Sequence, residues 1–406
     1  MLVHLTRKID SVLRRSLQLS LFSIIVFIAC NSAEEKRAQK AKEQAITDSI
    51  RLLYNPKDAH KEIDAFMQKL HKKSGFNGNV LVAKKGKIIY ENTLGWADYL
   101  HKDSLKIESQ FELASVSKPL TATGILLLVQ EGKIKLDQEV KEFFPDFPYD
   151  GVTIRMLLTH RSGLVNYVYF TDNLWPDKKK GMTNTDVMKI LAEHKPAPYS
   201  KPDVRFHYNN SNFMILAAII EQVSGQSFTV FMQENVFKPV GMKNTHVYSK
   251  ADYEKIPTDV VGHDKVWRRS VVQNFHDGPV GDKGIYSTVE DLFLFDQAMR
   301  EERLLNKAWQ DSAYKPHNEK SIKGVFNYGF GWRTFEQGKE HVVYHTGWWH
   351  GFKNLYIRDL KNDVTIVLLS NMANGSLTHL DDLYKILDMP VIRQGAYNGS
   401  GDYVGE

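Results

Sequence analysis

Two short motifs in the chain pair a hydroxyl with an amine three residues later. Ser115 and Lys118 form one S-x-x-K motif, and Ser312 and Lys315 form a second. On a helix, positions i and i+3 lie on one face, so the lysine amine can reach the serine hydroxyl. An amine in a dry cleft has a lowered pKa and can accept the hydroxyl proton, which makes serine a nucleophile. The spacing alone is a weak signal, since about one or two chance matches are expected in a chain this long.

The sequence that follows each motif separates them. An apolar segment, Leu120–Val129, comes directly after Lys118 and predicts a helix. Ser115 would then stand at a helix N-terminus, where backbone N–H groups and the helix dipole favour developing negative charge. Nothing comparable follows Ser312, and we interpret its motif as a surface coincidence.

Two further motifs follow Ser115 in chain order. Tyr208 and Asn210 form a Y-x-N motif just before a segment, 213–223, whose pattern predicts a helix. An H-T-G motif at 345–347 ends a predicted strand. A second Y-x-N match begins at Tyr90, but it lies upstream on a predicted strand, so its order is wrong.

The elements that must position these motifs fall into two groups. At the chain ends we expect a helix at 63–72, a hairpin across 78–94, strands at 328–332, 341–345, 352–357 and 364–369, and a final helix at 377–387. Residues from about 110 to 280 read as helical, and Ser287 with Glu290 resembles a capping box that opens a helix through Met299. The pattern predicts an α/β (α+β) fold: an antiparallel sheet flanked by helices and built from both chain ends, with an inserted all-helical domain. Catalytic groups would lie where the two parts meet.

Composition narrows the class of protein. The chain has 406 residues, 42% of them hydrophobic and 25% charged, which is typical of a globular protein with a sizeable core. The formal net charge of +5 is partly local, because residues 1–29 hold four basic side chains and one acidic one. The remainder is close to neutral, so no nucleic-acid partner is indicated.

The N-terminus looks like a targeting segment. A basic stretch, Arg7–Arg15, precedes the apolar run Leu17–Ala29, and Cys30, the only cysteine of the chain, follows directly. The run is short for a membrane span and resembles the signal peptide of bacterial lipoproteins, although Phe27 replaces the usual leucine. The resemblance implies cleavage after residue 29, a lipid on Cys30, and a protein anchored to the membrane in the bacterial envelope. The alternative is an uncleaved anchor with an incidental cysteine.

We therefore divide the chain into a signal peptide at 1–29, a tether at 30–55, a catalytic domain at 56–392 and a C-terminal tail at 393–406. With a single cysteine, the chain can form no internal disulfide.

Taken in order, the three motifs resemble the signature of the serine β-lactamase and penicillin-binding-protein superfamily, especially class C β-lactamases and DD-peptidases. The resemblance runs from about residue 60 to residue 388. The residues that carry it are Ser115-x-x-Lys118, Tyr208-x-Asn210 and His345-Thr346-Gly347.

The resemblance implies a role for each motif residue. Ser115 would attack a carbonyl and form an acyl-enzyme. Lys118 and Tyr208 would share general-base work and then protonate the leaving group. Asn210 would hydrogen-bond the substrate amide and orient Lys118.

The third motif would bind substrate along its strand through His345, Thr346 and Gly347. Gly347 would let the substrate lie close to the strand, since a Cβ there would obstruct it. The backbone N–H groups of Ser115 and Trp348 would form an oxyanion hole.

His345 is a departure, because β-lactamases of this family usually carry lysine there. Histidine is similar to some DD-peptidases, D-amino-acid peptidases and esterases of the family. Imidazole is mostly neutral at pH 7 unless neighbours shift its pKa. Two hypotheses stay open: a charged His345 that recognises a substrate carboxylate, and a neutral His345 that only donates a hydrogen bond.

The resemblance implies a serine hydrolase that needs no cofactor and acts on D-amino-acid-containing peptides, amides or related esters, with cell-wall peptide as the candidate substrate. The first alternative is an esterase or weak β-lactamase. The second is a penicillin-sensing or peptide-binding module that is acylated without turnover. Histidines 341, 345 and 350 match no common zinc spacing, so no metal site is predicted.

Overall fold

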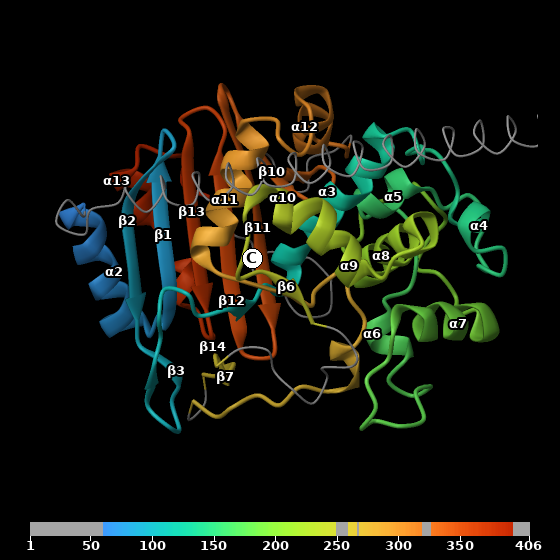
Figure 1. Cartoon of the computed structure of the whole chain (residues 1–406), viewed down its shortest axis with the longest axis horizontal. Coiled ribbons are helices and arrows are strands. Elements are labelled where there is room, and N and C mark those ends of the chain that lie inside the picture. The colour runs from blue at the N-terminus through green and yellow to red at the C-terminus, as the bar shows by residue number, and fades with distance from the viewer. Residues whose placement is uncertain (1–59, 249–258, 266–267, 319–325, 393–406) are drawn as a thin grey trace, which may run out of the picture. The chain divides into compact units, whose positions relative to one another are not determined.

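A seven-stranded antiparallel sheet organises the computed structural model, which describes residues 60–248, 259–265, 268–318 and 326–392 (Figure 1). From one edge to the other its strands are β2 (Lys87–Leu94), β1 (Gly78–Lys84), β13 (Val364–Ser370), β12 (Phe352–Asp359), β11 (Glu340–Trp349), β10 (Arg333–Gln337) and β9 (Phe326–Tyr328).

The two ends of the chain meet inside this sheet. Strand β1 pairs with β13, and their register sets Gly78 opposite Ser370. The predicted fold class, with a sheet assembled from both chain ends, is confirmed.

Helices cover both faces of the sheet. On one face, α2 (Lys61–Ser74) and α13 (Asp381–Ile386) close an apolar core with alternate residues of the strands. On the other face, α11 (Val289–Arg300) contacts β1 and β13. Because both faces are covered, β13 is buried at every position, and most of its residues are apolar.

The hairpin between β1 and β2 is closed by a two-residue turn, Lys85-Gly86. Both residues have positive φ, +53° and +70°, as the turns that match the twist of hairpin strands require. Glycine adopts this conformation without strain, which explains the turn signal in the sequence.

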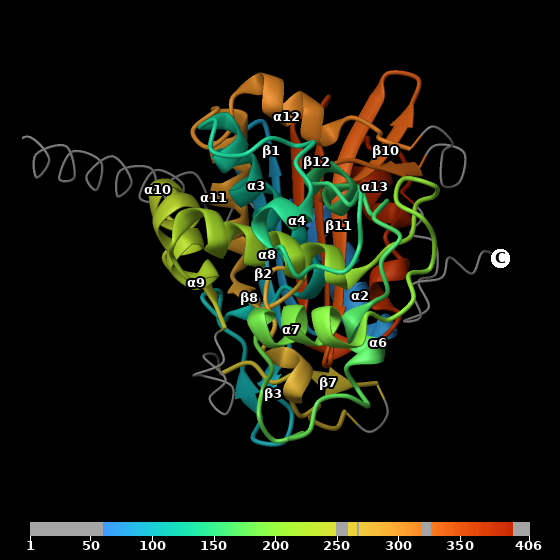
Figure 2. The same ribbon diagram turned by 90° about the vertical axis from the view of Figure 1, so that its right-hand side faces the viewer.

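The inserted region packs beside the sheet (Figure 2). Helix α8 (Asn210–Ser224) is its core element, and it contacts α3 (Ser117–Gln130), α5 (Ile154–Leu158) and α9 (Phe228–Met232).

The other helical segments of the described ranges, inside and outside the insertion, are η2 (Ala114–Val116), α4 (Val140–Phe143), α6 (Tyr167–Phe170), α7 (Asn184–His194), η3 (Gln233–Phe237), α10 (Lys238–Val240), η5 (Phe275–Asp277), α12 (Lys307–Tyr314) and η6 (Ser376–Thr378).

The insertion is mostly helical, but not entirely. Strand β5 (Phe111–Glu112) pairs with β8 (Ile285–Ser287), which also pairs with β6 (His246–Val247). The remaining short pairs are β3 (Trp96–Asp98) with β4 (Asp103–Ser104), and β7 (His263–Asp264) with β14 (Met372–Ala373). Strand β5 matters for the site, because it leads directly into the segment that carries Ser115.

Several local predictions were wrong in detail. The strand expected at 341–345 extends as β11 to Trp349, so the H-T-G motif lies within the strand and not at its end. Of the strand expected at 328–332, only Tyr328 lies in a strand, at the end of β9; residues 329–332, with Gly331 at a φ of +74°, connect β9 to β10. Helix α11 is capped one residue later than expected: the side chain of Thr288, not Ser287, accepts from the Asp291 N–H. The last helix is shorter than expected, since η6 and α13 replace a single helix over 377–387.

Within the described ranges, no single helix combines the length and apolar character that crossing a membrane would need. Only α8 taken together with the helical stretch Phe228–Val240 meets those criteria, with a bend of 83° between the two. The α8 residues from Ser211 to Ile220 are all buried in the protein core.

Candidate active site

Ser115 lies in a tight turn between a strand and a helix. Strand β5 ends at Glu112, and Ala114 then takes a φ of +51°, a conformation that alanine rarely adopts. Ser115 follows in the single 3₁₀ turn η2, which leads without a break into α3. The expected helix N-terminus is therefore present, with one extra tight turn that holds Ser115. Such backbone strain persists only where surrounding structure imposes it, and it is frequent at active sites.

Lys118 sits one turn after Ser115, on the first turn of α3. Its Nζ lies 2.8 Å from Ser115 Oγ, 2.9 Å from Asn210 Oδ1 and 2.9 Å from the carbonyl oxygen of Asp282. The last two partners can only accept, so a neutral amine donates its two hydrogens to them. Its lone pair is then left for the Ser115 hydroxyl proton.

The environment of Lys118 favours the neutral amine. Its side chain is fully buried, and this burial is the main cause that lowers its pKa from 10.5 to about 7. The Asp282 carboxylate opposes the shift, and the Arg333 guanidinium adds to it. An appreciable fraction of Lys118 is therefore deprotonated at neutral pH.

The Y-x-N motif wraps around the start of α8. Asn209 is the N-cap, and its side chain accepts from the Ser211 N–H. Its neighbours Tyr208 and Asn210 both line the cavity beside Ser115. The middle residue of the motif thus builds the helix end that fixes the two outer residues.

Tyr208 is held as a neutral phenol. Burial raises its pKa, while the Arg333 charge and a hydrogen bond with Ser115 act in the opposite direction. Its ring packs against the imidazole of His160, with centroids 4.3 Å apart. The Nδ1 of His160 contacts Asn209 N and Asn212 Nδ2, which fits the structural role that this residue type usually has.

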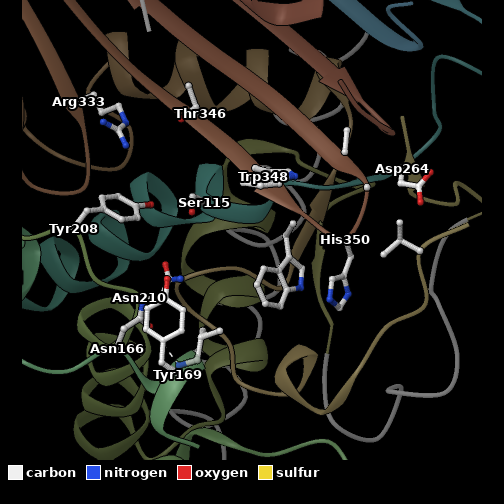
Figure 3. A pocket seen from close by; sticks show the side chains of 15 residues that line it. Ser115, Asn166, Tyr169, Tyr208, Asn210, Asp264, Arg333, Thr346, Trp348 and His350 are labelled. Atoms are coloured by element: carbon white, nitrogen blue, oxygen red, sulfur yellow. Dashed lines mark hydrogen bonds between the residues drawn. The ribbon is translucent and has the colours of Figure 1, made fainter. Parts of the chain in front are cut away.

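A cavity of about 460 Å³ opens over these groups (Figure 3). Ser115 lies in its wall between Tyr208 and Trp348, with Asn210 also near it and with Arg333 and His350 further out. Its other lining residues are Asn166, Val168, Tyr169, Asp264, Val271, Thr346, Trp349, Gly351 and Ala373. Tyr169 therefore lines the cleft, whereas Tyr167 is buried in the core.

Only part of the H-T-G segment reaches the cavity. Thr346 lines it, and Trp348 stands at it with 55% of its surface exposed. Gly347 does not line it, and its predicted closeness to substrate stays a prediction. The structure gives this glycine another reason: a Cβ there would lie 2.2 Å from the Leu113 carbonyl oxygen, so its absence lets β11 approach the turn that carries Ser115.

His345 does not contact the cavity either. It is fully buried, and burial, together with the charges of Arg333 and Lys118, holds its pKa well below the usual value. Its Nδ1 lies 2.7 Å from the Thr346 carbonyl and must donate to it, while Nε2 lies 3.0 Å from the Tyr328 hydroxyl. His345 is thus a neutral residue behind its strand, and its predicted role in substrate binding stays a prediction.

The cation of the cavity is Arg333, which sequence reasoning missed. It starts β10 opposite Tyr344, and its guanidinium carbon lies 5.3 Å from the centroid of the Tyr208 ring. The sequence held a signal for its position, because Gly338 marks a hairpin turn. The turn pairs Gln337 with Glu340, and the same register places residue 333 opposite Tyr344, next to the H-T-G segment. The wrongly placed strand end at residue 332 hid it.

The other nominated groups lie apart from the cavity. Ser312 and Lys315 are not among its lining residues, and Lys315 is exposed. The three histidines do not converge: His341 contacts Tyr314, and His350 contacts Asn274 and Asp277. In the described ranges no three His, Cys, Asp or Glu side chains are grouped to hold a metal ion. Cys30 and the segments 1–29 and 393–406 lie outside the described residues.

Comparison with known proteins shows the family. Residues 63–388 match the family described as Beta-lactamase. The chain belongs to the beta-lactamase family of serine hydrolases. Penicillin-binding protein 4* of Bacillus subtilis (strain 168) is 36% identical over 327 residues, which cover 77% of this chain and 71% of that protein.

Solved structures of the family share the fold. A penicillin-binding protein from Bacillus halodurans superposes with a TM-score of 0.70 at 24% identity, over 79% of this chain and 98% of that one. The D-amino acid amidase from Ochrobactrum anthropi SV3, complexed with L-phenylalanine amide, gives a TM-score of 0.65 at 22% identity, over 79% of this chain and 94% of that one.

Proposed function

We propose that this protein is a serine hydrolase that forms an acyl-enzyme at Ser115 and acts on D-amino-acid-containing peptides, amides or related esters, as DD-peptidases do. The observation that carries the proposal is the contact between Lys118 Nζ and Ser115 Oγ, 2.8 Å apart in a buried setting. It is the arrangement of a nucleophile with its base.

Acylation follows from the positions of three side chains. The neutral Lys118 amine takes the Ser115 proton while Oγ bonds to the substrate carbonyl. Tyr208 forms a hydrogen bond with Ser115, and its raised pKa keeps the phenol protonated while Ser115 attacks. We therefore assign Lys118 as the base and Tyr208 as the group that donates a proton to the leaving amine. Lys118 then returns the proton it took from Ser115 to Tyr208. The carbon–nitrogen bond then breaks and leaves an ester on Ser115.

The negative oxygen that forms during the attack needs donors. We assign this role to the backbone N–H groups of Ser115 and Trp348, because β11 packs against η2 beside the nucleophile. Water then cleaves the Ser115 ester, with the same two side chains moving the proton in the opposite direction. The acyl group leaves as an acid, and the serine hydroxyl is restored.

Arg333 indicates the substrate class. It is 9% exposed, lines the cavity and keeps its charge at every working pH. A guanidinium in the same cavity as the nucleophile suits a substrate that carries a carboxylate, such as the one a C-terminal D-amino acid supplies. The names of two relatives, a penicillin-binding protein and a D-amino acid amidase, support this class.

The apolar part of the cavity favours a second candidate, an esterase with weak β-lactamase activity. Val168, Trp348 and Trp349 line that part and offer uncharged surface for an acyl group. An ester without a carboxylate would not use Arg333, so the two candidates differ in their dependence on this residue.

The test is Arg333→Met, assayed with a D-alanyl-D-alanine peptide and with p-nitrophenyl butyrate. We expect kcat/KM for the peptide to fall about 10- to 100-fold, since a charged hydrogen bond contributes about 1.5–3 kcal/mol. Both substrates are measured above the pH at which Lys118 titrates, because the Arg333 charge also lowers the pKa of this base. The ester should change little there. Equal loss on both substrates, or no turnover of the peptide by wild type, would contradict the peptidase proposal. A single stoichiometric burst followed by arrest would instead identify a binding module.

A further inference from the structure

A buried pair of opposite charges lies directly behind the site. Asp282 and Lys283 are 1% and 4% exposed, and their charged atoms are 3.7 Å apart. The Tyr167 hydroxyl bridges them: Lys283 Nζ donates to it at 2.5 Å, and it lies 3.2 Å from an Asp282 carboxylate oxygen. Lys283 also donates to the Pro279 carbonyl at 3.0 Å.

Stability alone is a poor explanation for such a pair. Removing two charges from water costs free energy that their attraction often fails to repay, and apolar replacements of similar volume are often neutral or stabilising. The contacts of Asp282 and Lys283 therefore deserve a functional explanation, and these contacts lead to two parts of the site.

The first contact leads to the general base. The carbonyl oxygen of Asp282 accepts one of the hydrogens of Lys118 Nζ at 2.9 Å. The adjacent carbonyl, that of Gly281, accepts from Thr121 Oγ1 at 2.7 Å, almost one turn further along α3. Two hydrogen bonds thus hold the segment 281–282 against α3, the helix that carries the base Lys118.

The second contact leads to the wall of the cavity. The Lys283 ammonium lies 5.2 Å from the centroid of the Trp349 ring, which lines the cavity. The indole N–H of Trp349 donates to Asp277 at 2.5 Å. One buried pair therefore supports both the amine that takes the proton and a side chain that faces the substrate.

We propose that Asp282 and Lys283 are positioning residues for Lys118: the pair fixes the peptide carbonyl that orients the amine, and its carboxylate sets the electrostatic potential at Nζ. The inference rests on the proposed role of Lys118 as the base. It adds two residues outside the three motifs to the machinery of the reaction.

The direction of the effect follows from the charges that face Lys118. Burial lowers its pKa most, the Asp282 carboxylate raises it, and Arg333 lowers it. His160 and His345 feel the Lys118 charge and are held neutral by burial, and the Tyr208 ring lies 5.0 Å from Nζ. Removing the Asp282 charge leaves two influences that both lower the Lys118 pKa.

The experiment compares pH profiles of kcat/KM, whose acid limb reports the base of the free enzyme. The full chain is assayed from pH 5 to 9 with p-nitrophenyl butyrate, which carries no titrating group. In Asp282→Asn we expect the acid limb to move toward lower pH by roughly half a unit or more. In Lys283→Met, where the carboxylate loses its cation, the limb should move toward higher pH.

Asp296→Asn is the matched control. Asp296 is equally buried and pairs with Arg358 at 2.5 Å, but it lies on α11 beneath the sheet. It should lower the melting temperature and leave the limb where it is in wild type. A limb that stays in place in a folded Asp282→Asn or Lys283→Met, or that moves in the same direction in both, overturns the inference.

The failure of the proposed function would look different. If the Ser115→Ala variant still hydrolyses the ester as wild type does, the acyl-enzyme proposal is wrong, and this inference is wrong with it. If hydrolysis depends on Ser115 and the limb is unmoved, only the inference on Asp282 and Lys283 fails.

Discussion

Lys118 Nζ lies 2.8 Å from Ser115 Oγ, and its two other partners are carbonyl oxygens. Because those oxygens can only accept, the geometry directs the amine lone pair at the serine hydroxyl. A protonated Lys118 would donate to Ser115 and could not activate it.

Labelling by a fluorophosphonate probe should therefore depend on pH. With the pKa of Lys118 lowered to about 7, the labelling rate should rise with pH through about 7 and level off above it. Lys118→Ala should slow labelling by about 10²–10⁴-fold and remove this limb. Ser115→Ala should abolish labelling, and Ser312→Ala is the matched control that should not change it. A rate independent of pH in wild type would contradict the assignment.

His345 gives a second prediction, because its pKa is held well below the usual value by burial and nearby positive charge. The imidazole should stay neutral from pH 5.5 to 8.5, so KM for a D-alanyl-D-alanine peptide should show no titration near pH 6.5. A KM that rises through pH 6.5 and loses this trend in His345→Lys would show that the imidazole charge binds substrate.

His345→Lys itself should be costly. It places an amine where Arg333 and Lys118 already contribute positive charge, in a position with no exposure. We expect a loss of about 3 kcal/mol or more in the free energy of unfolding, measured in urea. A stable His345→Lys protein with higher β-lactam turnover would contradict the buried position of this side chain.

Gly347→Ala should lower the reactivity of Ser115 indirectly, by changing how β11 packs. The added Cβ would lie 2.2 Å from the Leu113 carbonyl oxygen and push β11 away from the turn that carries Ser115. We expect about 1–3 kcal/mol of destabilisation and labelling slowed by about 10- to 100-fold. Gly375→Ala is the control, since that glycine has a φ of −82° and its Cβ would meet only Thr378 Oγ1, at 3.8 Å. Equal labelling rates for both variants would refute the packing argument.

The N-terminus gives a prediction outside the described residues. We propose that Cys30 carries a lipid and that residues 1–29 are absent from the mature protein, since the apolar run ends at the only cysteine. Intact-mass measurement on protein extracted from membranes tests this. A mass that retains Met1 and an unmodified Cys30 would contradict it.

Local patterns predicted the elements whose burial is periodic or complete. The spacing of Ile63, Phe66, Met67 and Leu70 predicts α2, because one face of this helix meets the sheet and the other meets water. The sheet strands β1, β11, β12 and β13 were found because their apolar residues are concentrated between turn signals. The first two motifs also come together as expected around Ser115, whereas only Thr346 of the H-T-G motif reaches the cavity.

What escaped prediction depends on neighbours that are distant in the chain. The burial of His345, whose ring nitrogens contact Tyr328 and Thr346, favours the neutral one of the two hypotheses, and no feature of the H-T-G motif reports that burial. Arg333 follows a strand break at Gly331, where a positive φ interrupts a continuous apolar pattern. Asp282 and Lys283 look like loop residues, since an ion pair in the sequence carries no mark of burial.

The pairing of Gly78 with Ser370 also limits when the sheet can be completed during synthesis of the chain. Strand β1 is synthesised early, yet its partner β13 emerges only near the end of translation. The strand that carries Thr346 and Trp348 likewise comes after the whole helical insertion. Contacts that are so distant in sequence form slowly. A nascent chain that ends before β13 thus already contains Ser115 and Lys118, but it cannot yet form the pairing of β1 with β13 that joins the two parts of the sheet.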